Sequence, residues 1–361
     1  MREVLDYDGS ADDTIGKEVP GLSMDALRQS RDAIFTNHRT GIPHSEYLHK
    51  LDLAYAPIEL QDYAQPRNFV DALRIIDFMQ EMHQGLVEAT SPGERSNRGI
   101  VIACGQGRLL EVIAEAARIL GITHLTFVDI LERHIDMTRQ KAKNLYGNRY
   151  KSAPVKLSFV HKDIIDYEPP YSNDMLLNEW YGSNEMLRIS SPQELRTHRR
   201  RLYDALNDLL VTGGSLYETT PDPNRPGYYH TGVERTTRVL QEKSVLYGEH
   251  ERFLLSNWAV EDDQPDVGQS FPHQIRLVQM FDDERNEKGS AGFKYTHSAP
   301  AQNPETAYVD DRTVLSALEK TGNIKDTKNE MRACSGLVTY PSPDVTQAIK
   351  YMRSTIWSKI E

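Results

Sequence analysis

Residues 99–108 read GIVIACGQGR, and this stretch gives the strongest indication of the fold. Its first half is a short apolar run, which predicts a buried strand ending at Gly105. A segment with helical spacing follows, from Arg108 to Leu120, and Gly121 ends it. Glycines at such a turn let the backbone approach a ligand, and the following helix offers N–H groups to it. The turn alone is equally consistent with a tight strand-to-helix connection that binds nothing.

The segments after this turn continue the alternation of strand and helix. Such alternation predicts a parallel sheet that is covered by helices on both faces. Near the C-terminus we expect a helix from Arg312, a strand over 331–341 and a closing helix over 345–358. In the middle of the chain, helices are expected at 132–146 and 192–210, and strands at 124–130 (HLTFVDI), 155–163 (VKLSFVHKD), 174–180 (DMLLNEW) and 215–221 (SLYETTP).

Four sections of the chain are expected around this sheet. Residues 1–95 form an N-terminal helical segment or lid, with its strongest helix over 68–87. Residues 96–221 are the α/β core. Residues 222–305 are polar and rich in loops, which indicates an insertion that builds a substrate lid or a dimer contact, and residues 306–361 complete the core sheet. The extra helices suggest a homodimer.

Composition limits the class of function. The 361 residues are 39% hydrophobic and 26% charged, and no stretch approaches the roughly 20 apolar residues that span a membrane. A formal net charge of -11 argues against a nucleic-acid partner and favours a cationic small molecule or peptide. Two cysteines, Cys104 and Cys334, indicate reduced thiols and a cytoplasmic location, and the histidines lack the spacing of a metal site.

The second predicted strand ends in an acidic residue, Asp129, about 22 residues after Gly107. A carboxylate there can accept hydrogen bonds from both ribose hydroxyls of a nucleoside cofactor. A dinucleotide site would need a third glycine three residues after Gly107, and that position is Leu110. A nucleoside with an amino acid tail fits better, and Arg108 can pair with the carboxylate of that tail.

The third predicted strand ends in a second acidic residue, Asp163, which is followed by the apolar Ile164. A carboxylate at this edge of the sheet can bind the amino group of an adenine, and the apolar neighbour can pack against its ring. An acidic residue at a strand end is also a common helix cap, so both interpretations remain open at this point.

These segments resemble a known enzyme family. IVIACGQGR, LTFVDI, HKDIIDY and DMLLNEW have the order and spacing of the first four motifs of class I S-adenosylmethionine (SAM)-dependent methyltransferases, and the resemblance covers residues 63–220. It implies a Rossmann-like seven-stranded α/β core, with SAM as cofactor and S-adenosylhomocysteine (SAH) as product. The helix and strand expected near the C-terminus are similar to the final helix and reversed strand of that fold. The resemblance implies cofactor contacts from Gly105, Gly107, Arg108, Asp129, Asp163 and Ile164.

A narrower resemblance is to the protein arginine methyltransferases. The segment 174–182, DMLLNEWYG, is similar to the start of their double-glutamate loop, in which two carboxylates clamp the substrate guanidinium. This implies that Glu179 is one catalytic carboxylate and that Trp180 contacts the substrate. The family's second position is Arg188 here, so Glu185 is the candidate for the second carboxylate, with Glu194 as a more distant one.

Three more features belong to this narrower resemblance. The GQGR turn is similar to the symmetric-dimethylating branch, whose arginine contacts the SAM carboxylate, and Tyr63 stands where the family has a tyrosine near the sulfonium. Thr296-His297-Ser298 resembles the family's Thr-His-Trp loop, which implies a substrate contact from His297. No run of alternating strands is expected after residue 222, whereas the family has a β-barrel there. An alternative is therefore that the chain resembles the relatives of this family that methylate free arginine.

The sequence thus predicts a SAM-dependent N-methyltransferase that acts on a guanidino or amino nitrogen, in a small molecule such as arginine or in an arginine side chain. Two alternatives remain. One is an O- or C-methyltransferase acting on a small metabolite, and the other is a non-catalytic scaffold subunit with the same fold. An aminopropyltransferase is less consistent with the sequence, because Arg108 is placed for a carboxylate that its decarboxylated cofactor lacks.

Overall fold

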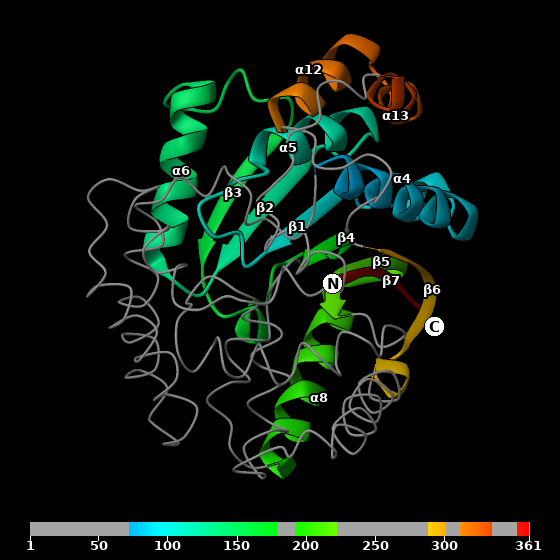
Figure 1. Cartoon of the computed structure of the whole chain (residues 1–361). Coiled ribbons are helices and arrows are strands. Elements are labelled where there is room, and N and C mark those ends of the chain that lie inside the picture. The colour runs from blue at the N-terminus through cyan, green and yellow to red at the C-terminus, as the bar shows by residue number, and fades with distance from the viewer. Residues whose placement is uncertain (1–71, 179–191, 222–287, 301–310, 334–351, 361) are drawn as a thin grey trace, which may run out of the picture.

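A seven-stranded sheet forms the centre of the molecule (Figure 1). The structure is a computed structural model that describes residues 72–178, 192–221, 288–300, 311–333 and 352–360. The strands lie in the order β3-β2-β1-β4-β5-β7-β6. Their bounds are β1 Arg98–Ile102, β2 His124–Asp129, β3 Lys156–His161, β4 Asn173–Asn178, β5 Leu210–Pro221, β6 Phe293–Pro300 and β7 Met352–Lys359.

The direction of the strands identifies the fold. Strands β1 to β5 pair in parallel, and β7 runs antiparallel to both β5 and β6. A single reversed strand inserted between the fifth and sixth parallel strands is the arrangement of the Rossmann-like class I methyltransferase core, so the predicted fold class is confirmed. Since β2 and β4 flank β1, the strand order reverses at β1, and the carboxyl end of β1 is where ligands bind in sheets of this kind.

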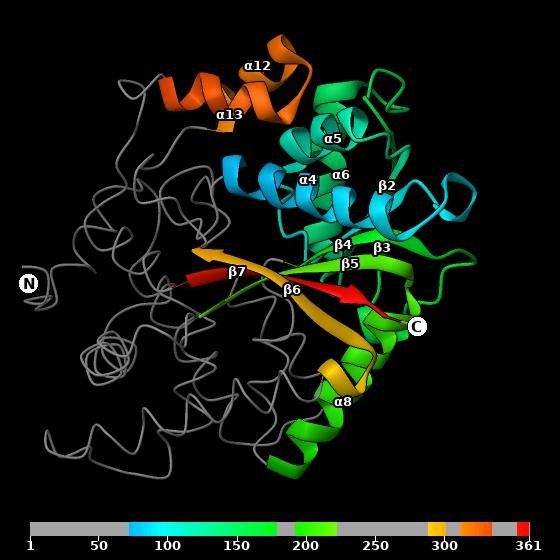
Figure 2. The same ribbon diagram turned by 90° about the vertical axis from the view of Figure 1, so that its right-hand side faces the viewer.

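Helices cover both faces of the sheet (Figure 2). On one face, helices contribute apolar side chains to the larger of two hydrophobic clusters: α4 Ala72–Ala89, α5 Leu110–Ile119, α6 Glu132–Tyr146, α12 Asp311–Thr321 and α13 Ile324–Ala333. The other face carries α8 Pro192–Asp208 and a short 3-10 turn, η2 Ile164–Asp166. A second 3-10 turn, η1 Pro92–Glu94, lies just before β1 in the chain. The helices of the core thus form two layers around the sheet.

Side-chain alternation along the strands divides the core in two. In β1, Val101 belongs to the cluster under α4 and α5, whereas Ile100 and Ile102 belong to the cluster under α8. In β5, Tyr217 faces the first cluster and Leu216 the second. Strands that are buried on both faces explain why this part of the sequence reads as continuous apolar runs.

A buried ion pair lies on the α8 face of the sheet. The ammonium group of Lys288 contacts the carboxylate of Glu218 in β5, and the two side chains are 3% and 8% exposed. The same ammonium group lies 4.7 Å from the ring centroid of Trp357 and 5.1 Å from that of Tyr203. This cluster attaches the chain before β6 to the end of β5 and to α8.

The C-terminal part of the sheet differs from the sequence prediction. Strand β7 occupies residues 352–359, where a closing helix was expected over 345–358, so that prediction was wrong for this stretch. The strand expected over 331–341 begins inside helix α13, and its remainder lies outside the described residues. Strand β6 lies within 222–305, the range assigned to an insertion, and it forms an edge of the core sheet.

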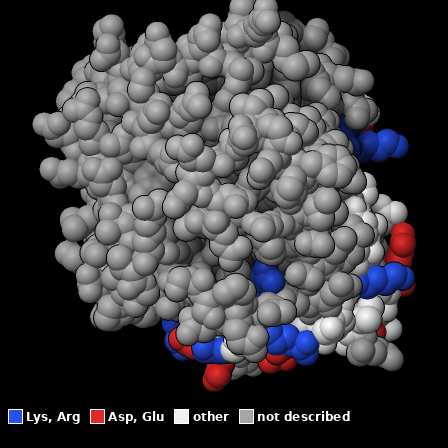
Figure 3. Space-filling view, turned by 60° about the horizontal axis from the view of Figure 1, so that its bottom comes forward, with Lys and Arg blue, Asp and Glu red and all other residues white. Residues whose placement is uncertain are grey.

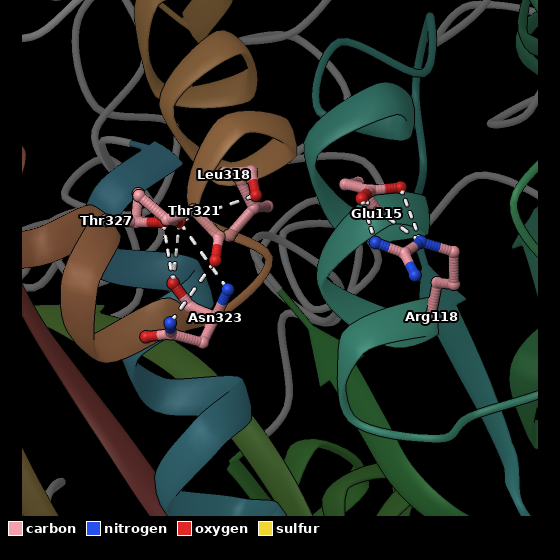
Figure 4. Close-up of polar contacts among 6 residues, drawn as sticks. All are labelled: Glu115, Arg118, Leu318, Thr321, Asn323 and Thr327. Carbon is pink, nitrogen blue, oxygen red and sulfur yellow. Dashed lines mark hydrogen bonds and ion pairs between the residues drawn. The ribbon is translucent and has the colours of Figure 1, made fainter.

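Helices α12 and α13 lie between β6 and β7 in the chain and meet at a tight corner (Figure 4). The hydroxyls of Thr321 and Thr327 lie 2.6 Å apart, and Thr327 also donates to the carbonyl of Asn323 at 2.8 Å. The side-chain oxygen of Asn323 accepts from the amide of Asp326 at 2.7 Å, which caps the first turn of α13. Val314 and Leu318 of α12 are fully buried in the core cluster, so this corner is part of the packed domain.

Candidate active site

The turn after β1 is held against the end of β2 by a carboxylate. The Oδ2 atom of Asp129 accepts a hydrogen bond from the amide of Gly105 at 3.0 Å. Its Oδ1 atom accepts from the amide of Leu131 at 2.9 Å and lies 3.2 Å from Nδ1 of His134. Asp129 is 5% exposed, so a buried charge is balanced here by backbone amides and an imidazole. The two motifs that the sequence placed at one ligand site do meet in space.

The two glycines of the turn have different surroundings. Both have a left-handed backbone, with φ of +51° at Gly105 and +67° at Gly107. A Cβ atom at Gly107 would lie 2.6 Å from Cγ2 of Thr138 in α6, so this position is filled by the protein itself. Among the residues that the structure describes, none would come within 4 Å of a Cβ atom at Gly105. Gly107 is therefore on the side of the turn that packs against α6, and Gly105 is on the side that is open with respect to the described residues.

Polar groups beneath the turn fix its shape. The hydroxyl of Thr138 donates to the carbonyl of Gly105 at 2.7 Å. The thiol of Cys104 lies 3.8 Å from the same hydroxyl, and burial, together with the carboxylate of Asp129, raises the pKa of this thiol. The thiol is therefore protonated at neutral pH. The Nε2 atom of Gln106 is buried and has no hydrogen-bond partner within the described part of the chain, so a ligand with an acceptor atom would satisfy it.

Arg108 makes an ion pair that the sequence did not indicate. Its Nη2 atom lies 3.0 Å from Oδ1 of Asp311, the first residue of α12. The two side chains are 11% and 19% exposed. The carbonyl of Arg108 accepts from the ammonium group of Lys141 in α6 at 2.9 Å. Arg108 thus joins the glycine turn to a helix that begins 203 positions further along the chain.

Asp163 and Ile164 lie where β3 ends and η2 begins. The Oδ1 atom of Asp163 accepts from the amide of Ile165 at 3.0 Å and thereby caps the turn η2. Ile164 is 1% exposed and belongs to the core cluster under α8. The capping role that the sequence left open is therefore present, and the adenine contact expected of these two residues stays a prediction.

His297 lies in strand β6, and the segment that resembled the Thr-His-Trp loop is part of this strand. Its Nε2 atom lies 3.0 Å from Oε2 of Glu81 in α4, and its ring contacts Phe78 edge-on. Burial is the main cause that raises the pKa of Glu81, with His297 acting in the opposite direction. These two side-chain contacts of His297 are with helix α4, and its expected contact with the substrate remains a prediction.

Four predicted site residues, Tyr63, Glu179, Trp180 and Glu185, lie outside the described residues. Three of them follow strand β4 in the sequence, and the last residue of this strand, Asn178, pairs with Ile102 at the end of β1. Asn178 is 4% exposed. Glu179 follows it directly in the sequence, so the backbone of β4 leads toward the edge of the sheet where the glycine turn lies.

The surface charge of the described residues is mixed in sign. Figure 3 shows one face of the molecule, with Lys and Arg side chains next to Asp and Glu side chains along its lower margin. On helix α8, for example, Arg200 pairs with Asp204 at 3.0 Å. None of the helices that the structure describes is both long enough and apolar enough to cross a membrane.

The chain was compared with known proteins. No protein-family model matches the sequence, and no curated protein does. Among solved structures, PKMT2 from Rickettsia typhi is similar to 80% of the chain at 13% identity with a TM-score of 0.39, and the chain spans 53% of that protein. The plantazolicin methyltransferase BamL is similar to 93% of the chain at 14% identity with a TM-score of 0.43, over 99% of its own length.

A SAM-dependent methyltransferase from Clostridium acetobutylicum is similar to 87% of the chain at 10% identity with a TM-score of 0.42, over 99% of its own length. The order and direction of the seven strands identify the fold independently of these similarities.

Proposed function

We propose that the protein is a SAM-dependent methyltransferase. The observation that carries this proposal is the contact between Gly105 and Asp129, which joins a glycine turn with an open side to a buried carboxylate at the carboxyl edge of the sheet. When bound, SAM supplies a methyl group on a sulfonium, which a nucleophile can attack in line. The protein's part is to bind the cofactor, to orient the nucleophile and to exclude water.

The described residues fit a nucleoside with an amino acid tail. A carboxylate oxygen can accept two hydrogen bonds, so Oδ2 of Asp129 can accept from a ribose hydroxyl in addition to the amide of Gly105. The open side of Gly105 leaves room for the ligand, and the buried amide nitrogen of Gln106 offers a donor. The N-cap residue of α5, Leu109, has no side chain that can cap the helix, and the N–H groups of a first helical turn favour an anionic group. Asp163 and Ile164 are assigned to the adenine.

For the substrate, we propose a guanidino or amino nitrogen of a small molecule such as arginine, or of an arginine side chain. This part of the proposal is supported by the similarity of residues 174–182 to the double-glutamate loop. Glu179 would orient the cationic group by paired hydrogen bonds, with Glu185 as the second carboxylate and Trp180 beside them. A formal net charge of -11 favours the approach of such a substrate.

Calorimetric titration with SAH, repeated in the presence of free L-arginine, tests both parts. Micromolar binding of SAH that tightens with arginine is the expected result. Binding without an effect of arginine would support the methyltransferase and reject free arginine as its substrate. No binding of SAH would reject the methyltransferase and favour a scaffold subunit with the same fold.

A variant tests the catalytic carboxylate. Glu179→Gln should leave SAH affinity unchanged and reduce turnover on the accepted substrate at least tenfold. Glu319→Gln, an exposed position on α12, is the matched control for the loss of one negative charge. Unchanged turnover in Glu179→Gln would reject the double-glutamate interpretation.

A further inference from the structure

The contact between Arg108 and Asp311 connects the glycine turn to the α12–α13 corner. We propose that the carboxylate of Asp311 competes for Arg108 with the carboxylate of the cofactor's amino acid tail, and that the bound cofactor displaces Asp311 from this contact. Cofactor binding is then coupled to the position of α12. This inference rests on the proposed function, because it assigns the tail of SAM or SAH to Arg108.

The geometry places Asp311 as a competitor for this arginine. Arg108 follows Gly107 directly, so its side chain starts from the turn that would hold the cofactor. Its Nη2 atom lies 3.0 Å from Oδ1 of Asp311, and both side chains are largely removed from solvent. An arginine in such a place needs a carboxylate partner, since an unpaired buried guanidinium would be strongly destabilising. Asp311 supplies one such carboxylate in this structure.

Asp311 and the ligand tail present the same chemical group. A planar guanidinium pairs with any carboxylate through its fork of N–H groups, so the tail of the cofactor can replace the Asp311 contact. Two carboxylates on one guanidinium would repel each other, which favours exchange over sharing. The charge of Arg108 is balanced before and after the exchange, so its desolvation does not oppose the exchange.

The displaced carboxylate also has a favourable place. Asp311 begins α12, and the unpaired N–H groups of a first helical turn stabilise a negative charge. Its side chain is 19% exposed, so water reaches it. Helix α12 is tied to α13 through the corner of Thr321, Asn323 and Thr327 (Figure 4), and Lys328 of α13 pairs with Asp77 of α4. The release of Asp311 would therefore loosen the N-terminus of α12 and leave α13 attached to α4.

Binding of two ligands by the variant Asp311→Asn tests this inference. SAH carries the amino acid tail, whereas 5′-methylthioadenosine has the same nucleoside and lacks that tail. Loss of the competing charge should lower the Kd for SAH by about fivefold and leave the Kd for 5′-methylthioadenosine unchanged. Glu319→Gln, on the same helix and with the same change of charge, should bind both ligands as the wild type does.

The ratio of the two Kd values is the decisive measurement, because it does not depend on the folded fraction of a preparation. If Asp311→Asn yields no folded protein, Asp311→Ser is measured in the same way. Equal or weaker SAH binding, relative to 5′-methylthioadenosine, would overturn the inference and make Asp311 a residue that only orients Arg108. Failure of the wild type to bind SAH would instead reject the proposed function itself. In the background of Arg108→Gln, replacement of Asp311 should no longer change the ratio.

Discussion

The carboxylate of Asp129 accepts a hydrogen bond from the amide of Gly105 at 3.0 Å, across 24 positions of sequence. This contact means that the group assigned to the cofactor's ribose also shapes the turn assigned to its tail. Folding of the turn and recognition of the cofactor therefore depend on one buried charge. Replacement of Asp129 should affect both.

The first prediction concerns Asp129→Asn. An amide has one acceptor oxygen, whereas the carboxylate serves the amides of Gly105 and Leu131 with two, so one buried N–H group would face an NH₂ group. We expect the free energy of unfolding to fall by about 1–3 kcal/mol and SAH binding to be lost. Urea denaturation and calorimetry measure the two effects. Asp136→Asn, an exposed position on α6, should change neither by comparison.

The second prediction separates the two sources of strain at the glycine turn. Gly107→Ala combines a left-handed backbone with a Cβ atom 2.6 Å from Cγ2 of Thr138. Gly121→Ala has a similar backbone, with φ of +76°, and its Cβ atom would meet none of the described residues within 4 Å. We expect a loss of about 1–2 kcal/mol of stability for Gly121→Ala, and about 1–3 kcal/mol more for Gly107→Ala. Equal losses in urea denaturation would show that the contact with Thr138 relaxes without cost.

Much of the core could be predicted from the sequence, because its signals are local. Helix α6 has the predicted bounds, residues 132–146, and the first five strands lie in or next to the predicted runs. These strands are buried on both faces, so their sequences are continuous apolar runs. In β4, for example, Met175, Leu176 and Leu177 are each at most 1% exposed. A glycine with positive φ ends α5 where Gly121 was expected.

The last two strands lack that signal. In β7, Ser354 is fully buried, yet its burial depends on a hydrogen bond to the hydroxyl of Tyr217, at 3.0 Å, rather than on an apolar side chain. In β6, Phe293 is buried whereas Lys294 and Tyr295 are exposed, as is common in an edge strand. Aromatic and polar residues alternate in β6 only over the short stretch from Phe293 to His297, and β7 shows no alternation, so both segments lack the continuous apolar run that identified the first five strands.

In the candidate site, too, the features with a local sequence signal were predicted and those without one were missed. Gly105 and Asp129 were predicted together, because the ends of adjacent parallel strands meet at one edge of the sheet. Asp311 was missed, because a partner 203 positions from Arg108 leaves no trace in the local pattern of either residue. The contact of Thr138 with the turn was missed for the same reason, since a threonine within a helix is not a distinctive residue.

The third prediction concerns the buried pair of Lys288 and Glu218. Lys288→Met would leave the carboxylate of Glu218 buried without its counter-charge, and we expect the free energy of unfolding to fall by about 3–5 kcal/mol. The double variant Lys288→Met/Glu218→Leu removes both charges and should recover most of that loss. Lys320→Met is the control, because its pair with Glu330 is exposed and should contribute at most about 1 kcal/mol. A double variant as unstable as the single one would show that the charges themselves are required.

The fourth prediction is a dependence of stability on pH that arises from His124. Burial, and then the positive charges of Arg98 and Lys156, lower the pKa of His124 below its ordinary value of 6.5. Nη1 of Arg98 lies 2.9 Å from Nδ1, and a guanidinium can only donate, so Nδ1 is unprotonated and Nε2 donates to the hydroxyl of Ser158 at 2.8 Å. Protonation of Nδ1 would break the first of these contacts.

The sign of the effect follows from proton binding. Between the lowered pKa of the folded protein and 6.5, the unfolded chain binds more protons than the folded one, so stability falls as the pH falls through this range. Burial also lowers the pKa of His83, which adds a slope of the same sign. In His124→Asn, whose side-chain oxygen can still accept from Arg98, urea denaturation between pH 7.5 and 5.5 should show a smaller slope than the wild type. An unchanged slope in His124→Asn, equal to that of the control His161→Asn at the exposed end of β3, would contradict this assignment.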